Sequence, residues 1–180
     1  ILFFASYISA PYEDKNINEY FKFLANSDFS TIKSNLNQYI QEVTNRKTQK
    51  KETIKNEILR SQEEVMIANF LYMNQINYEY EPIYQYRILD SRKPYTPDFI
   101  IKQGNKITYI EHFGITEDGQ NNRYTKQELE KYKAIVNNKI KLHRKHGTDL
   151  IYTFSKYKDN RSILSHLEEE LLKRGYELNK

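Results

Sequence analysis

The sequence predicts an α/β fold in which amphipathic helices alternate with short strands. Two long segments, at residues 53–76 and 125–145, carry apolar residues every three or four positions, which is typical of helices. Aromatic and β-branched residues cluster in short runs between these segments, beginning with 78–86, and indicate strands. A further strand and helix are expected at 150–155 and 162–174. The predicted order is helix, three strands, helix, strand, helix.

The first 50 residues are predicted to form a helical appendage. Apolar residues fall at helical spacing in two short segments, from Ile17 to Leu24 and from Ile32 to Val43. The stretch from Thr44 to Lys55 is polar and basic, as in a linker or the exposed start of a helix. Because residues 1–50 carry no recognisable catalytic motif, we expect them to pack against something outside this chain. Residues 51–180 would then form the functional domain.

Composition limits the class of protein. A chain of 180 residues can form one domain with a sizeable core. The absence of cysteine excludes disulfides, thiolate metal sites and cysteine nucleophiles. The lack of cysteine also favours a cytoplasmic location. No apolar run approaches the length of a membrane span, so we expect no membrane partner. A net charge of +4 with 16 tyrosines suits nucleic acid, although an AT-rich coding sequence would produce the same enrichment.

The segment from Tyr95 to Gly114 is predicted to form a β-hairpin that carries two carboxylates. Its turn falls at residues 103–105, Gln-Gly-Asn. Asp98 lies on the first strand and Glu111 on the second, among apolar residues where a lone charge is costly. If the two acids meet across the hairpin, they offer hard oxygen ligands to a divalent cation. The alternative is a pair of carboxylates at the sheet edge that face water.

Three further polar side chains border the apolar faces of the long helices. Glu64, on the first helix, could point at the sheet, although a solvated glutamate is the simpler interpretation. Lys139 and His143 share a face of the second helix with Leu129 and Tyr132. Their simpler interpretations are a lysine that extends to solvent and a histidine that hydrogen-bonds within the core.

The chain contains four phrases, in order, that resemble a known domain: EVMIANFLYMNQINYEYE, YTPDFII, YIEHFGI and KLHRKHGTDLIYTFS. They look like the nuclease-like domain embedded in some bacterial superfamily 1 DNA helicases of the UvrD/Rep-like group. The element order, with Glu64, Asp98 and Glu111 at the motif positions, resembles the PD-(D/E)XK nuclease superfamily. The resemblance covers about residues 53–175. It implies a restriction-endonuclease-like core, α-β-β-β-α-β-α, with a small mixed sheet flanked by helices, and makes residues 1–50 part of a host helicase.

The resemblance implies metal-assisted hydrolysis of DNA, in a protein that takes part in DNA repair. Asp98 and Glu111 would bind Mg²⁺ or Mn²⁺ together with the backbone carbonyl of His112, and Glu64 would reach the metal through water. The residues expected to contact substrate are Tyr132, His143, Arg92, Lys93, Arg123 and Lys126. The basic ones would hold the DNA backbone in a salt-sensitive manner, although such surface charges are more often only solvated.

One residue departs from the family pattern, which has Glu-X-Lys on the third strand. Phe113 stands at the lysine position, and strand alternation places it on the same face as Glu111. The family lysine would orient the attacking water and stabilise charge on the phosphate. In some relatives it has moved to the following helix, which makes Lys139 the candidate replacement. The polar loop from Ile115 to Tyr124 follows Glu111 closely and could reach the substrate.

Three classes of function therefore remain open. The first is a metal-dependent deoxyribonuclease domain of a DNA helicase. The second, expected if Lys139 does not reach the acids, is a catalytically inactive DNA-binding or docking module of a helicase. The third is an unrelated α/β domain that makes only protein contacts. The chain contains no GxxxxGK[ST] motif, so ATP hydrolysis is not expected of it, even if the parent protein is an ATP-dependent helicase.

Overall fold

The structure is a computed structural model of the chain. The residues that it describes are 37–38, 41, 44–45, 47–86 and 94–179. The chain divides into two compact units, Ile1–Arg46 and Lys47–Lys180. The few described residues of the first unit are helical, and the rest of the predicted appendage lies outside the described residues. No helix in the described part of the chain is long and apolar enough to cross a bilayer.

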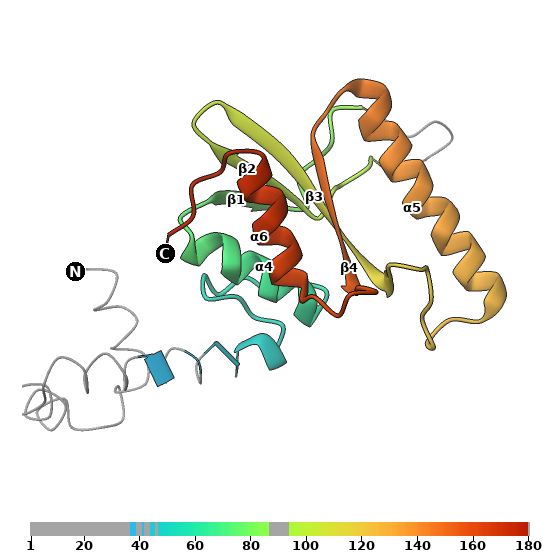
Figure 1. The fold of residues 1–180 in the computed structure, drawn as a ribbon, viewed down its shortest axis with the longest axis horizontal. Coiled ribbons are helices and arrows are strands. Elements are labelled where there is room, and N and C mark those ends of the chain that lie inside the picture. Colours follow the sequence, from blue (N-terminus) through green and yellow to red (C-terminus); the bar gives the residue numbers. More distant parts are fainter. Residues whose placement is uncertain (1–36, 39–40, 42–43, 46, 87–93, 180) are drawn as a thin grey trace, which may run out of the picture. The chain divides into compact units, whose positions relative to one another are not determined.

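In the second unit, a four-stranded mixed sheet carries helices on both faces (Figure 1). The elements are α4 (Gln62–Met73), β1 (Asn77–Tyr80), β2 (Phe99–Gln103), β3 (Lys106–Thr116), α5 (Lys126–His146), β4 (Leu150–Lys156) and α6 (Ile163–Lys173). The strand order is β1-β2-β3-β4, in which β3 and β4 are parallel and the other pairs antiparallel. The predicted α/β class, element order and small mixed sheet are confirmed.

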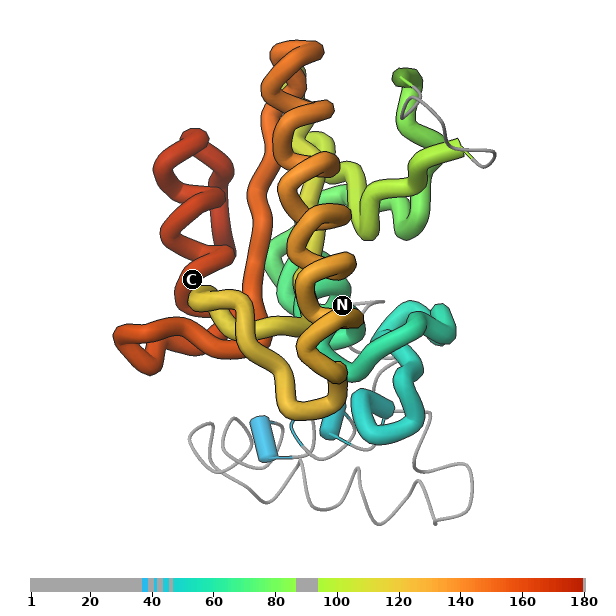
Figure 2. The backbone as a smooth tube through the Cα atoms, turned by 90° about the vertical axis from the view of Figure 1, so that its right-hand side faces the viewer, coloured from blue at the N-terminus to red at the C-terminus, as the bar shows by residue number. Residues whose placement is uncertain are grey.

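The two faces of the sheet carry separate apolar layers. Strand alternation directs Ile110 and Ile151 into a core shared with α4 and α6. Phe113, on the opposite face, packs with side chains of α5. Figure 2 shows α5 in front of the strands, with α4 behind them. Glu111 therefore belongs to the α5 face of β3, and the side chain of His112 belongs to the α4 face.

The first long helix is shorter than predicted. Helical spacing favours residues 53–76, but α4 begins after Ser61, whose hydroxyl accepts a hydrogen bond from the Glu64 N–H at 3.0 Å. The preceding segment turns tightly, with Asn56 in the left-handed conformation at φ 65°. Ile58, expected on the apolar face, is 71% exposed. The Ser61 cap therefore places Glu64 in the first helical turn.

The strands near the candidate acids also differ from their predicted bounds. β1 ends at Tyr80 because Glu81 takes the left-handed conformation at φ 49° and donates its N–H to the carbonyl of Asp98 at 2.9 Å. β2 begins at Phe99, so Asp98 precedes the strand instead of lying in it. β3 is longer than expected and continues through Thr116. Asp98 is thus held at the point where the chain enters the sheet.

The second half of the domain follows its predicted boundaries within two residues. α5 begins with a capping box in which Thr125 and Glu128 bond reciprocally. It ends at Gly147, whose φ of 65° favours glycine. Ser162 caps α6 in the same way that Ser61 caps α4. These local signals fix where α5 and α6 start along the sequence.

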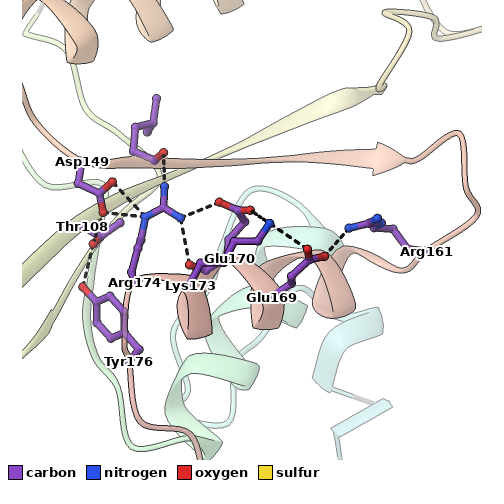
Figure 3. A network of polar contacts seen from close by, with 9 residues as sticks. Thr108, Asp149, Arg161, Glu169, Glu170, Lys173, Arg174 and Tyr176 are labelled. Carbon is purple, nitrogen blue, oxygen red and sulfur yellow. Dashed lines mark hydrogen bonds and ion pairs between the residues drawn. The ribbon is translucent and has the colours of Figure 1, made fainter.

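A polar network joins the end of α6 to the start of β4 (Figure 3). Arg174 Nε lies 2.8 Å from Asp149 Oδ2, and Arg174 Nη1 lies 2.6 Å from Glu170 Oε2. Thr108 Oγ1 donates to Asp149 Oδ2 at 2.7 Å, and Tyr176 OH donates to Thr108 Oγ1 at 2.9 Å. These bonds tie α6 to both β3 and β4 at the end of the sheet.

Candidate functional site

A cleft of about 840 Å³ lies between the first turn of α4, the later part of β3 and the inner face of α5. Six of the predicted site residues line it: Glu64, Asp98, His112, Arg123, Tyr132 and Lys139. Glu111 lies beneath the cleft surface, because its side chain is fully buried. The fold therefore gathers residues from α4, β3, α5 and β4, together with residues of the intervening loops, at a single concave surface.

Asp98 is buried at the cleft, with an exposed fraction of 4%. Its Oδ2 accepts the N–H of His112 at 2.7 Å, and its Oδ1 accepts Arg60 Nη2 at 2.8 Å. Burial raises the pKa of the Asp98 carboxyl above its ordinary value, and the nearby charge of Glu64 adds to this shift. The His112 main chain thus fixes the Asp98 side chain across the β2–β3 hairpin.

Glu111 has no exposed surface, and both of its carboxylate oxygens are bonded. Tyr95 OH donates to Oε1 at 2.5 Å, and Lys139 Nζ donates to Oε2 at 2.6 Å. Burial and, next, the charge of Asp98 raise the pKa of Glu111 to about 7. The two acids therefore repel one another within the same buried region, and the alternative of edge carboxylates facing water is excluded.

Glu64 also points inward from α4. Its exposed fraction is 7%, and its Oε2 accepts the hydroxyl of Tyr80 at 2.6 Å. Arg60 Nε lies 4.0 Å from the same oxygen. The solvated alternative for Glu64 is therefore wrong. Its position in the first helical turn places the carboxylate near Asp98, on which it acts electrostatically.

Lys139 reaches the acids from the opposite side. Its Nζ lies 5.3 Å from the centroid of the Tyr95 ring and 6.0 Å from that of Phe113, in addition to its short bond to Glu111. The ammonium group thus stands over the ring of Phe113, which shares a face of β3 with Glu111. The prediction that α5 directs Lys139 toward the hairpin is confirmed, and extension into solvent is excluded.

The remaining predicted contact residues lie in different places. Tyr132 accepts the N–H of Gly114 through its hydroxyl at 3.2 Å and stacks on Tyr124, with ring centroids 5.5 Å apart. Lys126 is exposed at the start of α5 and does not line the cleft. Arg92 and Lys93 lie outside the described residues.

His143 does not line the cleft, which contradicts its predicted contact with substrate. The ring is buried and lies 3.1 Å from Tyr95 OH through Nε2 and 2.9 Å from Thr148 Oγ1 through Nδ1. Burial lowers the pKa of His143 to about 4, so the ring is neutral at pH 7. The interpretation of His143 as a core residue with a hydrogen bond is therefore correct. Its link to the site is the hydrogen bond with Tyr95.

Arg60 and Glu63 line the cleft but are absent from the predicted site residues. Arg60 lies next to Asp98, and its spacing of four residues from Glu64 is the signal that points to it. Glu63, the neighbour of Glu64, is the second, and its Oε2 lies 2.9 Å from both His112 Nε2 and Ser155 Oγ. The bond to His112 lowers the pKa of Glu63. No local pattern pairs Glu63 with β3 and β4, because the contact depends on how α4 crosses the sheet.

The donor set fits a hard divalent cation in its chemistry. Glu64, Asp98 and Glu111 provide carboxylate oxygens that are buried and mutually repulsive, and a divalent ion would relieve that repulsion. Across the described residues, no three acidic or histidine side chains are already grouped around one point. Binding of a divalent ion would therefore require these carboxylates to rearrange around it.

Comparisons with protein-family models, curated proteins and solved structures found no match to this chain.

Proposed function

We propose that the domain within residues 51–180 is a metal-dependent nuclease with a restriction-endonuclease-like core that hydrolyses phosphodiester bonds of DNA. One observation carries the proposal. Asp98 and Glu111 are buried together beside a large cleft, and Lys139 lies 2.6 Å from Glu111. Two coupled acids with an adjacent ammonium group are the parts that metal-assisted phosphodiester hydrolysis needs.

Each residue then has a distinct role. Asp98 and Glu111 would hold Mg²⁺ or Mn²⁺, with the carbonyl of His112 as a further ligand and Glu64 acting through water. When bound, such an ion polarises the phosphoryl oxygen and lowers the pKa of the attacking water. Lys139 would stabilise the charge that develops on the phosphate, which is the role that Phe113 cannot fill.

Supporting residues hold this arrangement in place. Tyr95 donates its hydroxyl to Glu111 and so fixes one carboxylate oxygen. Asn121 donates its side-chain amide to the carbonyl of Gly114, and its Oδ1 accepts the N–H of Arg123 at 2.8 Å. These bonds dock the loop before α5 against β3. Arg123 is thereby placed on the cleft wall, where it would contact a DNA phosphate.

A catalytically inactive DNA-binding module is the second candidate. It is favoured by the cationic partners that the acids already have, since Arg60 bonds to Asp98 and Lys139 bonds to Glu111. If those ion pairs persist, the cleft would bind the DNA backbone without cutting it. In either case we propose, from the four sequence phrases alone, that the domain belongs to a helicase whose remainder is its partner.

Calorimetric titration of Mn²⁺ into the purified protein tests the proposal first. Wild type is expected to bind, and Asp98→Ala and Glu111→Ala are expected to lose binding. Asp159→Ala is the matched control, because Asp159 is an exposed acid that does not line the cleft. Cleavage of DNA with Mg²⁺ should be lost in Asp98→Ala while the circular dichroism spectrum is retained.

The same set of proteins separates the alternatives. DNA binding in chelator, with no cleavage under any metal condition, would indicate the inactive module. Absence of both metal binding and DNA affinity at low salt would contradict both candidates and favour a domain that makes only protein contacts. Unchanged cleavage by Asp98→Ala would refute the proposed site.

A further inference from the structure

Arg60 places a cation among three carboxylates at the cleft. Its Nη2 lies 2.8 Å from Asp98 Oδ1 and 3.0 Å from Glu81 Oε1. Its Nε lies 4.0 Å from Glu64 Oε2. The Arg60 side chain is nevertheless 59% exposed and lines the cleft. The guanidinium is therefore held by its acidic partners on one side and open to the cleft on the other.

The chemical need for a cation at this position follows from the burial of Asp98. A carboxylate that is 4% exposed and close to two other acids is costly unless positive charge compensates it. Asp98 Oδ2 is already bonded to the N–H of His112. Oδ1 is thus the oxygen left for a cation, and Arg60 occupies it.

We propose that Arg60 is a placeholder cation, which neutralises Asp98 in the metal-free protein and is displaced from Oδ1 when the divalent ion binds. This inference rests on the proposed function, since it concerns the same carboxylates. A divalent ion and a guanidinium beside the same carboxylate oxygen repel one another. Metal binding at Oδ1 and the Arg60–Asp98 ion pair therefore compete.

The position of Arg60 makes such a displacement feasible. An ion pair with an exposed arginine is weak, because water competes for both charges. Glu81 is also well exposed and can keep hold of the guanidinium after Asp98 is released. Tyr80 OH accepts both the main-chain N–H and the Nε of Arg60, each at 3.3 Å. The residue is thus tethered next to the site when its outer end moves.

Lys139 differs from Arg60 in a way that assigns the two cations different roles. Its partner Glu111 has no exposed surface, and the Lys139 ammonium lies against the rings of Tyr95 and Phe113. Little water reaches that pair, so it is harder to separate. We therefore assign displacement to Arg60, and Lys139 stays in place as the cation that faces the phosphate.

The test is a calorimetric titration of Mn²⁺ into wild type, Arg60→Gln and Arg123→Gln at one ionic strength. Removing the competing cation should tighten Mn²⁺ binding by Arg60→Gln about fivefold, which is the size expected for a partly exposed ion pair. Arg123→Gln removes the same charge from the same cleft but has no bond to Asp98. It should change the affinity by less than about twofold, which reflects only general electrostatics.

Thermal unfolding gives a second measurement that does not depend on catalysis. Without metal, Arg60→Gln should melt below wild type, because Asp98 loses its counter-charge. Saturating Mn²⁺ should raise the melting temperature of Arg60→Gln more than that of wild type, because a tighter ligand stabilises the folded state more. Arg123→Gln should respond to Mn²⁺ as wild type does.

The outcomes separate this inference from the proposed function. Equal Mn²⁺ affinity in wild type and Arg60→Gln, or equal tightening in both variants, overturns the placeholder role and leaves the metal site standing. Failure of wild type and Arg60→Gln alike to bind Mn²⁺ overturns both the metal site and the inference. Binding by Arg60→Gln alone supports the inference in its strongest form.

Discussion

Lys139 Nζ lies 2.6 Å from Glu111 Oε2, although the two residues are 28 positions apart and belong to α5 and β3. The side chain that strand alternation places beside Glu111 is the ring of Phe113. The packing of α5 on the sheet therefore supplies the positive charge beside Glu111 that Phe113 does not provide. The chemistry of the site depends on this helix–sheet contact.

Given the proposed function, we expect Lys139→Met to reduce metal-dependent cleavage by about 100-fold or more, because the charge proposed to stabilise the phosphate is lost. Lys133→Met is the matched control. Lys133 lies on the same helix, pairs with Glu130 and does not line the cleft. Initial cleavage rates at saturating Mg²⁺ provide the measurement, with circular dichroism to verify folding. Equal rates for Lys139→Met and wild type would remove Lys139 from the mechanism.

The pKa of Glu111 predicts a pH dependence of stability. It is raised from 4.5 to about 7 in the folded protein, so the folded state binds a proton more readily than the unfolded state does. The contribution of Glu111 to the free energy of unfolding is therefore fully present below pH 4.5 and is lost as the pH rises toward 7. Relative to Glu111→Gln, the free energy of unfolding of wild type should fall by up to about 3 kcal/mol over this range.

Urea unfolding of both proteins at half-unit pH steps measures this difference. His143 has the opposite effect, because its pKa is lowered to about 4 and the stability it contributes is lost as the pH falls below 6.5. Wild type and Glu111→Gln both keep His143, so its contribution largely cancels when the two curves are subtracted. A difference that does not change between pH 4.5 and 7 would mean that Glu111 titrates normally.

We predict that the exposed ring of Tyr124 stacks on an unpaired base of DNA. It lines the cleft, is 40% exposed and stacks on Tyr132. Given the proposed function, Tyr124→Ala should weaken binding of single-stranded DNA about tenfold and that of a blunt duplex much less. Tyr152→Ala is the control, because Tyr152 is also 40% exposed but lies on β4 outside the cleft. Fluorescence anisotropy in chelator makes the comparison, and equal losses in the two variants would contradict it.

Arg174 is expected to stabilise the fold without affecting binding or catalysis at the cleft. It is partly buried and bonds to Asp149, Glu170 and the carbonyl of Leu150 at the junction of α6 and β4. Arg174→Ala should lower the free energy of unfolding by about 1–2 kcal/mol, since several charge-assisted bonds are lost together. Arg161→Ala removes an exposed arginine from the other end of the same network and should change little. Similar losses in both variants would argue against a specific role for Arg174.

Much of the domain could be predicted because its signals are local. The Thr125–Glu128 capping box and Gly147 fix α5, and the turn at 103–105 sets the register in which β3 faces β2. That register alone is enough to bring Asp98 and Glu111 together across the hairpin. The same kind of reasoning fails at residues 53–61. The apolar spacing there favours a helix, whereas the chain turns at Asn56 and the helix begins only after its cap at Ser61.

The sequence by itself determined the order of the elements, the ends of α5 and the presence of two carboxylates at the β2–β3 hairpin. Only the tertiary structure decided that Glu64 turns inward and that His143 lies in the core. It also decided that Lys139 bonds to Glu111 and that Arg60 pairs with Asp98. The physical reason is that helical periodicity gives the face on which a side chain lies. What stands opposite that face depends on how the helices pack across the sheet.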